Sequence, residues 1–563
     1  MIIATVYLHT AFFDFAYDDF GQIVFNQGIK SWSFALRYFQ SDVWAHIGGI
    51  PLYYRPVYMI WLAANYKLFG LTPLYWHVTA IAVHLLACLL FYFFAARLTG
   101  DKWVAIVAVF LFGLHPVHVE DVAWISGATE TLLAALVFGS LLCYFKHRDS
   151  GQLRMDGWQA ASLLLAVLAV MTKETGVILP AFIGSYEWVF RRREASRKDA
   201  LMRAARAAAP YVLVSIGYVI VRALALRRLA PPHTKFGLVS TLLAWPKILV
   251  FYIAHLLLPL RLSAFYNLIR VEHPGWSNFA LPVAVIAAGA VLVYYGSRRS
   301  RVFAFLSLWC LALSIPMLNV TLLYAVENVH DRYLFLPSAA LCVILASLLA
   351  RLKEMGAART VAAVLTVIAA GYAFVTVRES QYWMNDEALG QHGIAVSPGH
   401  PLAPQVVANA YIRAGRIEEA LPYLVDASEA QPDNVDTLAG LGLCYSEMGA
   451  LSKAAEYLTK AIAVDRFYAR THLLLGSVRL QQNRLDEAET EIRKAMDLQR
   501  FARGALFLHY YLGKILYARG NIQGALREYL LEASNDPTID PAVVSARAGV
   551  EAIQRQLRLH SLK

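Results

Sequence analysis

Charged residues are scarce in this chain. Asp, Glu, Lys and Arg make up 16% of its 563 residues, whereas about 25% is usual for soluble proteins. Hydrophobic residues make up 58%, compared with roughly 45–50% in a typical soluble domain. The composition therefore argues against an ordinary soluble protein. It predicts a polytopic membrane protein with room for one further domain.

Cysteine is also rare, and no two of the five cysteines are close in sequence. A disulfide framework or a zinc site needs paired or closely spaced cysteines, so neither is expected. The amino terminus lacks a basic region and a clear small-residue cleavage site, so we expect no cleavable signal peptide. The formal net charge is +11. In a membrane protein this surplus indicates basic cytoplasmic loops and no nucleic-acid binding.

Long hydrophobic stretches are abundant. Crossing a bilayer takes roughly 20 apolar residues. The stretches that reach or approach this length lie at 74–96, 103–119, 128–145, 158–173, 175–190, 209–227, 278–296, 302–319, 333–350 and 360–378. The first apolar segment, Ile2–Phe13, is shorter, so we expect a truncated first helix or a true start further upstream. The sequence thus predicts an all-α fold with about eleven transmembrane segments.

The positions of Lys and Arg predict which ends of these segments face the cytoplasm. They crowd the loops at 146–154, 191–206, 298–301 and 351–359. These loops share one side if the short stretch 244–258, bracketed by Pro246 and Pro259, is re-entrant or interfacial, as we expect. By the positive-inside rule that side is cytoplasmic. The outer side then carries Asp18–Asp19, 120–127, Lys173–Glu174, 228–277, 320–332 and everything after about residue 380.

The carboxy-terminal third repeats with a period of 34 residues. Tyr411 and Ala420, for example, recur as Tyr445 and Ala454. This period, with small residues where paired helices touch, is typical of tetratricopeptide repeats, which form an α-solenoid. The concave face of such a solenoid can receive a protein or peptide. A spacer or oligomerisation module is the alternative.

Four regions follow from these patterns. We predict a membrane-embedded domain at 1–380, a linker at 381–400, about four tetratricopeptide repeats at 401–538 and a capping helix at 539–563.

Two adjacent carboxylates, Asp18 and Asp19, follow the first apolar segment. Ionised groups near hydrocarbon are costly, so a paired acid at a membrane boundary suggests a function. A solvated turn just outside the lipid is the alternative. If these acids act on a substrate, they are candidates for a general base, because a carboxylate can take a proton from an attacking hydroxyl group.

A polar run links two apolar segments further along. His115 and His118 are three residues apart and can share a helix face. They can ligate a metal, contact a phosphate or cap a helix. Pro116 interrupts the run and no HExxH spacing exists, which favours phosphate or sugar contact over a metal. Glu120 and Glu130 follow as further acids.

Two cations stand at other segment ends. Lys173 and Glu174 break an apolar run, either as an ion-paired turn or as a cation for a lipid phosphate oriented by its neighbour. Arg332 opens another segment and suits bidentate phosphate recognition. A snorkelling interfacial arginine is the alternative. Arg55 and His84 are weaker candidates, because each can be a buried structural group.

Acids and cations on one membrane face suit sugar transfer from a lipid phosphate. A carboxylate takes the proton of the acceptor hydroxyl. The anomeric carbon passes through an oxocarbenium-like state. Cations stabilise the charge that grows on the leaving phosphate. A divalent metal is possible for such a leaving group but not required, and the sequence predicts no metal ligands.

The chain resembles the transmembrane and tetratricopeptide-repeat O-mannosyltransferase family and its bacterial relatives, within the GT-C glycosyltransferase superfamily. The matching stretches are Tyr17-Asp18-Asp19, Tyr54-Arg55-Pro56, Leu68-Phe69-Gly70-Leu71, His115-Pro116-Val117-His118-Val119-Glu120, Lys173-Glu174 with Gly176, and Asp331-Arg332-Tyr333-Leu334-Phe335-Leu336-Pro337-Ser338. The resemblance implies a polyprenyl-phosphate sugar donor, catalysis on the non-cytoplasmic face, and a catalytic role for Asp18 or Asp19. It departs in having a short first helix, fewer repeats than the animal members, and Asp121 and Trp124 after Glu120.

We therefore predict a membrane glycosyltransferase, for which the resemblance suggests mannose and a protein or envelope acceptor that the repeats recruit. The assigned roles are a base at Asp18 or Asp19, support of the acceptor or of the base's charge by Glu120 and Glu130, and donor-phosphate binding by Lys173, Arg332, His118, His115 and Arg55. We expect a bacterial inner membrane with periplasmic repeats, or an endoplasmic reticulum membrane with luminal repeats in a eukaryote. The rivals are a non-catalytic scaffold for an envelope complex and a transporter. The latter is disfavoured because no internal repeat is evident among the membrane segments.

Overall fold

The computed structural model describes residues 1–44, 53–151, 154–190, 196–227, 238–318, 329–498, 507–534 and 541–561. Within these ranges the regular structure is helical and includes no strand, so the predicted all-α class is confirmed. Parts of the predicted loops and repeats lie outside the described residues: Arg191–Arg193, 228–237, 320–328, 499–506 and 535–538.

The chain divides into two compact units. The first comprises Met1–Asp19, Tyr38–Gln40 and Tyr54–Pro398. The second comprises Phe20–Arg37, Ser41–Tyr53 and Gly399–Lys563. The stretch 381–400, which we predicted as a linker, carries helix α15 and spans the boundary between Pro398 and Gly399.

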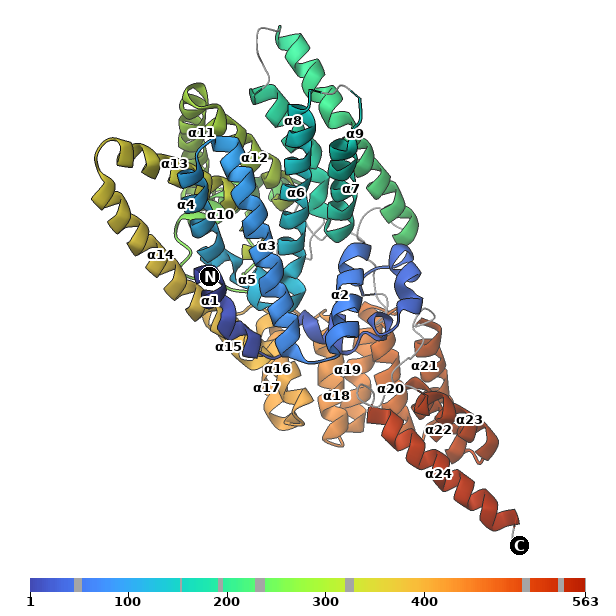
Figure 1. Ribbon diagram of the computed structural model, residues 1–563. Coiled ribbons are helices and arrows are strands. Elements are labelled where there is room, and N and C mark those ends of the chain that lie inside the picture. The colour runs from blue at the N-terminus through green and yellow to red at the C-terminus, as the bar shows by residue number, and fades with distance from the viewer. Residues whose placement is uncertain are drawn as a thin grey trace. The chain divides into compact units, whose positions relative to one another are not determined.

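The first unit holds the apolar helices (Figure 1). Their bounds are α1 Ile2–Tyr7, α2 Pro56–Phe69, α3 Pro73–Thr99, α4 Lys102–Leu114, α5 Val119–Ala123, α6 Thr129–Asp149, α7 Gly157–Thr172, α8 Leu179–Phe190, α9 Arg197–Leu226, α10 Leu238–Leu257, α11 Leu281–Arg299, α12 Arg301–Met317, α13 Phe335–Glu354, α14 Ala358–Ser380 and α15 Asp386–Val396. Short 3-10 turns precede several of them, including Pro116–His118, Ile125–Ala128, Glu174–Ile178 and Asp331–Leu334.

Seven helices of the described chain are long and apolar enough to cross a membrane, which makes this an integral membrane protein. They are α3, α6, α9, α10, α11, α13 and α14, some of them extended by an adjoining turn. The helix pair Lys102–Leu114 and Pro116–Ala123, bent by 54°, makes an eighth if it forms one span. The shorter apolar helices are Ile2–Phe12, Gly157–Thr172 and Arg301–Met317.

Helix α10 differs from what the sequence suggested. We expected 244–258 to be too short to span, with Pro246 at its start. The helix instead begins at Leu238 and Pro246 lies inside it, so the apolar part at Val239–Leu257 has 19 residues. This length is sufficient for a span, and the premise that the segment is short was wrong.

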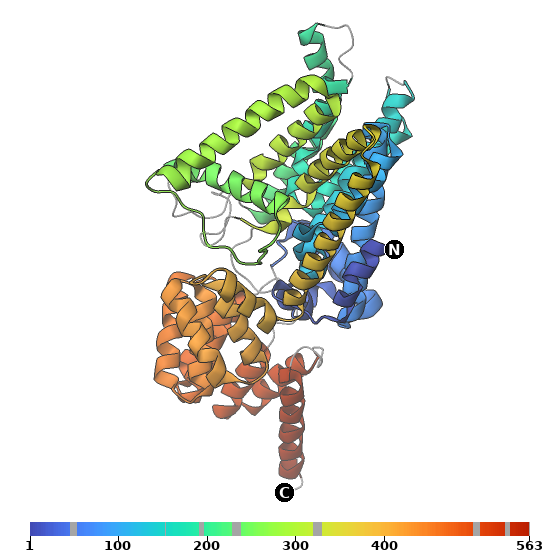
Figure 2. The same cartoon turned by 90° about the vertical axis from the view of Figure 1, so that its left-hand side faces the viewer.

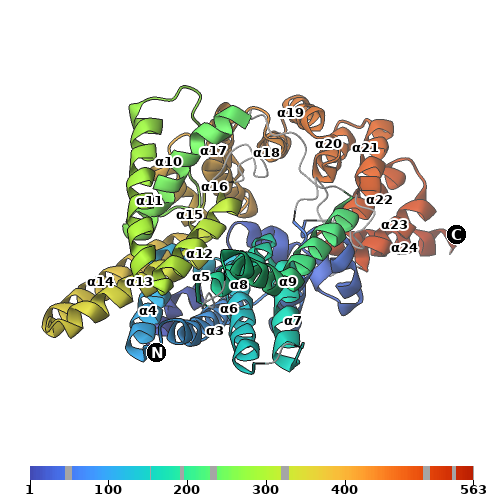
Figure 3. The same cartoon turned by 90° about the horizontal axis from the view of Figure 1, so that it is seen from above.

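Helix α6 lies between α3 and α7 and packs against both (Figure 3). An aromatic core fills the space between these helices and their neighbours. Phe182 stacks on Trp309 with ring centroids 3.8 Å apart, and Trp309 donates its indole N–H to the Leu336 carbonyl at 2.9 Å. Burial of these large rings, with this one polar atom satisfied, stabilises the bundle from which the functional groups project.

Several helices of this unit have a polar residue at one end and a basic loop at the other. α6 begins beside Glu130 and ends with Lys146 and Arg148, whereas α7 ends at Thr172, directly before Lys173. α13 follows Arg332 and ends with Arg351 and Lys353. Caps fix where such helices begin. The Asp156 carboxylate, for example, accepts a hydrogen bond from the Gln159 main chain at 2.8 Å.

The second unit is a stack of paired helices, drawn in orange to red in Figure 1. Their bounds are α16 Leu402–Arg413, α17 Ile417–Ala430, α18 Val435–Glu447, α19 Leu451–Val464, α20 Ala469–Gln481, α21 Leu485–Leu498, α22 Leu508–Ala518, α23 Ile522–Ala533 and α24 Pro541–Ser561. α24 runs as a single helix towards the carboxy terminus (Figure 2). The stretch just after the acid pair also belongs to this unit, where the Arg413 guanidinium lies 3.7 Å from the ring centroid of Phe20.

Small residues lie where the repeat helices touch, as the 34-residue period predicted. A Cβ atom on Gly476 would lie 2.7 Å from the Ile492 side chain, which is closer than such atoms approach. The turns within the repeats use a left-handed residue. Gly449 has φ +77°, and Asn483 takes the equivalent place in the next repeat with φ 60°.

Candidate active site

The two adjacent acids have different surroundings. Asp19 is fully buried, and its Oδ1 accepts hydrogen bonds from the Ser126 main-chain N–H at 2.9 Å and from the Ser126 hydroxyl at 2.6 Å. Its Oδ2 accepts from the Ala16 N–H at 3.2 Å. Asp18 is only partly buried, and its carboxylate makes no hydrogen bond within the described part of the chain. The Asp18 carboxylate is therefore the one whose oxygens the described chain leaves without a hydrogen-bond donor.

Both carboxyl groups titrate near neutrality. Burial raises the pKa of Asp18 from 3.8 to about 7, which Asp386 reinforces and Arg332 and Arg55 oppose. Burial also raises the pKa of Asp19 to about 7, against the hydrogen bonds from Ser126 and Ala16. A general base works best when its pKa lies near the working pH, and a pKa of about 7 suits such a role.

Tyr17 turns the chain into this acid pair. Its φ of 54° lies in the left-handed region, which is uncommon for a bulky residue and costs conformational energy. Its main-chain N–H donates to the Asp386 carboxylate, and its ring lies 5.8 Å from Trp124 and 5.5 Å from Phe265, measured between centroids. These contacts hold Asp18 and Asp19 in place.

Each candidate cation of this region is paired with an acid. Lys173 contacts Glu130, and both side chains are buried. Arg332 contacts Glu120 through its guanidinium, and its main-chain N–H donates to the same carboxylate at 3.1 Å. The third pair joins Arg55 to Glu174 at 2.9 Å between Nη2 and Oε2.

The first two pairs form one cluster around Tyr333. Lys173 Nζ and the Arg332 guanidinium carbon each lie 5.4 Å from the Tyr333 ring centroid. Asp121 is fully buried beside these groups, and neither of its carboxylate oxygens has a hydrogen-bond partner in the described chain. We call Glu120, Asp121, Glu130, Lys173 and Arg332 the acid–cation cluster. The cluster brings negatively and positively charged side chains together where little solvent reaches them.

Lys173 lies just beyond the end of α7. Burial lowers its pKa, as do Arg55 and Arg332, whereas the Glu130 carboxylate raises it. Unpaired, this ammonium group would be costly to bury, so Glu130 keeps it charged and in position.

His115 and His118 are placed elsewhere. His118 Nε2 is 2.8 Å from the Ser338 hydroxyl, and its ring packs on Phe335 at 4.2 Å between centroids. His115 Nε2 lies 3.2 Å from the Leu256 carbonyl. The contacts of both residues are with core groups and with main-chain atoms, and none is with the acid–cation cluster. We interpret the pair as structural, together with His84, whose Nε2 lies 3.2 Å from the Gly113 carbonyl.

The described residues contain no group of three or more His, Cys, Asp and Glu arranged to hold a metal ion.

Sequence reasoning missed two residues that act on the acid pair. Asp386 influences Asp18 and fixes Tyr17, and Ser126 holds Asp19. Asp386 lies in a stretch that we had treated as a linker. The signal that would have found it is Asn385-Asp386-Glu387, a helix cap followed by acids directly after the last apolar segment.

The fold and the site define a class of protein: a polytopic membrane protein with a buried cluster of acids and cations, joined to helical repeats. Models of the tetratricopeptide repeat match residues 411–466, 445–503 and 473–538, which confirms the predicted repeats.

Comparison with curated relatives points to one family within this class of membrane proteins. Mouse protein O-mannosyl-transferase TMTC3 is 22% identical over 555 residues, covering 88% of this chain and 59% of the relative. Human protein O-mannosyl-transferase TMTC2 is 32% identical over 193 residues, 33% of this chain and 23% of the relative. A protein O-mannosyl-transferase of Caenorhabditis elegans is 25% identical over 407 residues, 68% of this chain and 55% of the relative. These matches confirm the resemblance to the transmembrane and tetratricopeptide-repeat O-mannosyltransferase family over most of this chain, which spans about 59% of the mouse relative.

Proposed function

We propose that the protein is a membrane glycosyltransferase that moves a sugar from a polyprenyl-phosphate donor to a protein or envelope acceptor on the non-cytoplasmic face. The observation that carries this proposal is the carboxyl group of Asp18, which is partly buried, has no hydrogen-bond partner in the described chain and has a pKa of about 7. The relatives' names, which specify O-mannosyl transfer to protein, support mannose as the sugar and protein as the acceptor.

The reaction follows from the charges. Asp18 takes the proton of the acceptor hydroxyl as the hydroxyl oxygen bonds to the anomeric carbon. The bond between that carbon and the phosphate oxygen breaks, and the polyprenyl phosphate leaves with the electron pair. Arg332, whose guanidinium has five donors, and Lys173 stabilise the charge that grows on the phosphate. Arg55, which pairs with Glu174 and, like Arg332, lowers the pKa of Asp18, is a third cation near the reacting groups that can bind the donor phosphate.

Asp19, Glu120 and Glu130 position these groups. Asp19 anchors the chain to Ser126, and the two glutamates hold Arg332 and Lys173. A bound phosphate must share these cations with their carboxylates or displace them. The paired state therefore keeps two buried cations in place before the donor arrives.

The repeats recruit the acceptor or a partner protein in this proposal, because stacked helical repeats present an extended concave surface. We place them outside the cytoplasm, in the periplasm of a bacterium or in the endoplasmic reticulum lumen of a eukaryote. The basic residues that end α6 and α13 favour a cytoplasmic position for those helix ends.

Two measurements on the full-length protein test the donor class. Intact-lipid mass spectrometry of the purified protein should detect a copurified polyprenyl phosphate. Membranes containing the protein should transfer label from polyprenyl-phosphate mannose to protein, with control membranes inactive. A protein that carries no such lipid and transfers no sugar from any polyprenyl-phosphate donor would instead fit a non-catalytic scaffold.

A further inference from the structure

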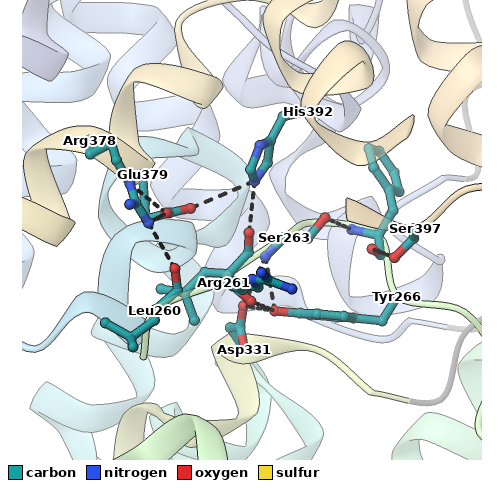
Figure 4. A network of polar contacts seen from close by, with 11 residues as sticks. Leu260, Arg261, Ser263, Tyr266, Asp331, Arg378, Glu379, His392 and Ser397 are labelled. Atoms are coloured by element: carbon teal, nitrogen blue, oxygen red, sulfur yellow. Dashed lines mark hydrogen bonds and ion pairs between the residues drawn. The ribbon is translucent and has the colours of Figure 1, made fainter. Parts of the chain in front are cut away.

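The irregular segment 260–266, shortly after α10, is held by side chains from α15 (Figure 4). His392 of α15 donates a hydrogen bond from Nε2 to the Leu262 carbonyl at 2.8 Å. Ser397, the residue that caps the end of α15, donates from its hydroxyl to the Phe265 carbonyl at 2.9 Å. Main-chain carbonyls in a buried segment need such donors, and here one helix supplies two of them. The segment is therefore fastened to α15.

The same segment is held at further points by groups outside α15. The Asp331 carboxylate accepts hydrogen bonds from the Tyr266 hydroxyl at 2.6 Å and from the Ser263 N–H at 3.3 Å. Arg378, near the end of α14, donates to the Leu260 carbonyl at 2.8 Å. Irregular segments are usually the more variable parts of a fold, but one that is hydrogen-bonded at several points has little freedom. Segment 260–266 is therefore a fixed support.

This support presents the ring of Phe265 to the acid pair. The Phe265 side chain is fully buried. Its ring meets that of Tyr17 edge to face, with centroids 5.5 Å apart and an interplanar angle of 88°. This geometry is one of the preferred arrangements of two aromatic rings and adds to the stability gained by their burial. Phe265 therefore fixes the side chain of the residue directly before Asp18.

Helix α15 also holds the main chain of Tyr17. Asp386, the first residue of the helix, is buried, and its carboxylate accepts a hydrogen bond from the Tyr17 N–H. Tyr17 has a φ of 54°, a strained conformation for a bulky residue that persists only where its surroundings enforce it. Rotation of this main chain would swing the Asp18 carboxylate away. The ring and the main chain of Tyr17 are thus both tied to α15, one through Phe265 and the other through Asp386.

We propose that α15 positions the base. Asp386 and Phe265 are its positioning residues, because both act on Asp18 through Tyr17. This assignment rests on the proposed function, in which Asp18 takes the proton of the acceptor hydroxyl. The two residues hold the base without binding the donor in this scheme. Their loss should therefore lower kcat and leave the KM for the donor unchanged.

Asp386 has a second effect on the base, through its charge. Burial raises the pKa of Asp18. The negative charge of Asp386 adds to that increase, whereas the positive charges of Arg332 and Arg55 oppose it. Asp19 is a further charged group beside Asp18. Asp386 therefore influences both where the base points and the pH at which it works.

Hydrogen–deuterium exchange of the full-length protein, measured by mass spectrometry, tests the positioning without requiring transfer. Asp386→Ala removes the acceptor of the Tyr17 N–H, so this amide should exchange about tenfold faster or more, as loss of a hydrogen bond to a charged group allows. Asp386→Asn keeps an oxygen acceptor and should retain most of the protection. Phe265→Leu removes the ring contact and should also speed exchange. Phe182→Leu alters an equally buried ring that stacks on Trp309, and as the matched control it should leave exchange at Tyr17 unchanged.

Transfer kinetics at equal amounts of folded protein test the consequence for the base. Asp386→Ala and Phe265→Leu should lower kcat about 10- to 100-fold, as a small misplacement of a catalytic group can, with the KM for polyprenyl-phosphate mannose unchanged. Asp386→Asn should keep most of kcat at high pH. Its kcat/KM should level off at a lower pH, because Asp18 loses a neighbouring negative charge. Phe182→Leu should retain the full kcat.

Unchanged exchange at Tyr17 in both Asp386→Ala and Phe265→Leu would overturn the proposal, as would an equal loss of kcat in Phe265→Leu and Phe182→Leu. An unchanged pH profile in Asp386→Asn would contradict the effect of charge. Faster exchange in a protein that transfers no sugar would support the hold of α15 on Tyr17 and contradict the proposed function. Full transfer with exchange and kcat unaltered in both variants would contradict only the positioning.

Discussion

Ser126 holds Asp19 through two hydrogen bonds to the same carboxylate oxygen, at 2.9 Å from the main chain and 2.6 Å from the hydroxyl. The carboxylate of Asp18, one residue earlier, makes no hydrogen bond in the described chain. The pair thus divides its work: one acid fixes the loop and the other is available to a substrate. The sequence left open which acid is the base, and this contrast favours Asp18.

This division predicts separable effects on stability. Ser126→Ala removes one of the two hydrogen bonds to Asp19 and leaves a buried carboxylate oxygen less satisfied. Unfolding in detergent, followed by intrinsic fluorescence, should show a loss of about 1–3 kcal/mol. Asp18→Asn should not lower the unfolding midpoint, because its carboxylate makes no hydrogen bond and its raised pKa means that its ionisation opposes folding. Equal destabilisation by both substitutions would contradict the division.

The Lys173–Glu130 pair predicts a non-additive double substitution. Both side chains are buried, so Lys173→Met alone leaves an unpaired carboxylate and should cost about 3–5 kcal/mol. Adding Glu130→Gln removes that charge and should recover much of the stability. Transfer activity should stay low in the double variant, because the cation for the phosphate is absent.

Thermal unfolding and transfer rates should be measured for Lys173→Met, for Glu130→Gln and for the double variant. Comparison of the three with the unaltered protein gives the coupling between the two residues. Recovery of activity together with stability would show that Lys173 is purely structural.

The pKa of about 7 at Asp18 predicts how activity depends on pH. A base must be ionised, so kcat/KM should rise with pH and level off above about 7. In Asp18→Asn the residual kcat/KM should not show this rise with pH. A rate that falls as pH rises from 5 to 7 would contradict the assignment of Asp18 as the base.

The same two acids predict the opposite trend for stability. Their folded pKa of about 7 lies above the ordinary value of 3.8, so between these values the folded chain holds protons that the unfolded chain releases. Stability should therefore decrease as pH rises from about 4 to about 7. Unfolding midpoints across this range measure the trend. Asp18→Asn together with Asp19→Asn should flatten it, and an unchanged slope would argue against both shifts.

A substitution in the repeats tests the close packing of their helices. Gly476→Ala places a Cβ atom 2.7 Å from the Ile492 side chain, so the repeats should lose about 1–3 kcal/mol of stability. Limited proteolysis should then cut the second unit faster. Gln523→Ala, at an exposed position of α23, removes only solvent-exposed atoms and serves as the control. Equal resistance of the two variants would contradict this packing.

Much of the fold could be predicted from local sequence patterns. The 34-residue period found the repeats, and apolar length found the membrane helices, because both reflect the regular spacing of side chains along one helix. Helix α10 was misjudged because Pro246 lies inside it, where a proline more often marks an end.

The arrangement of the site was harder to predict from the sequence. The pairs Lys173–Glu130 and Arg332–Glu120 join residues separated by 43 and 212 positions, and no local pattern fixes such pairings. The spacing of His115 and His118 suggested a shared polar face. Pro116 instead begins a 3-10 turn there, and both rings pack in the core.

The most direct test of the central claim compares sugar transfer by two neighbouring aspartates. Asp14 is exposed and near Asp18 in the same segment, so Asp14→Asn is a matched control for removing one carboxylate. With labelled polyprenyl-phosphate mannose and equal amounts of folded protein, Asp18→Asn should lower the transfer rate about 100-fold or more, as expected for loss of a general base. Asp14→Asn should retain the full rate. Full activity in Asp18→Asn would contradict the proposed mechanism.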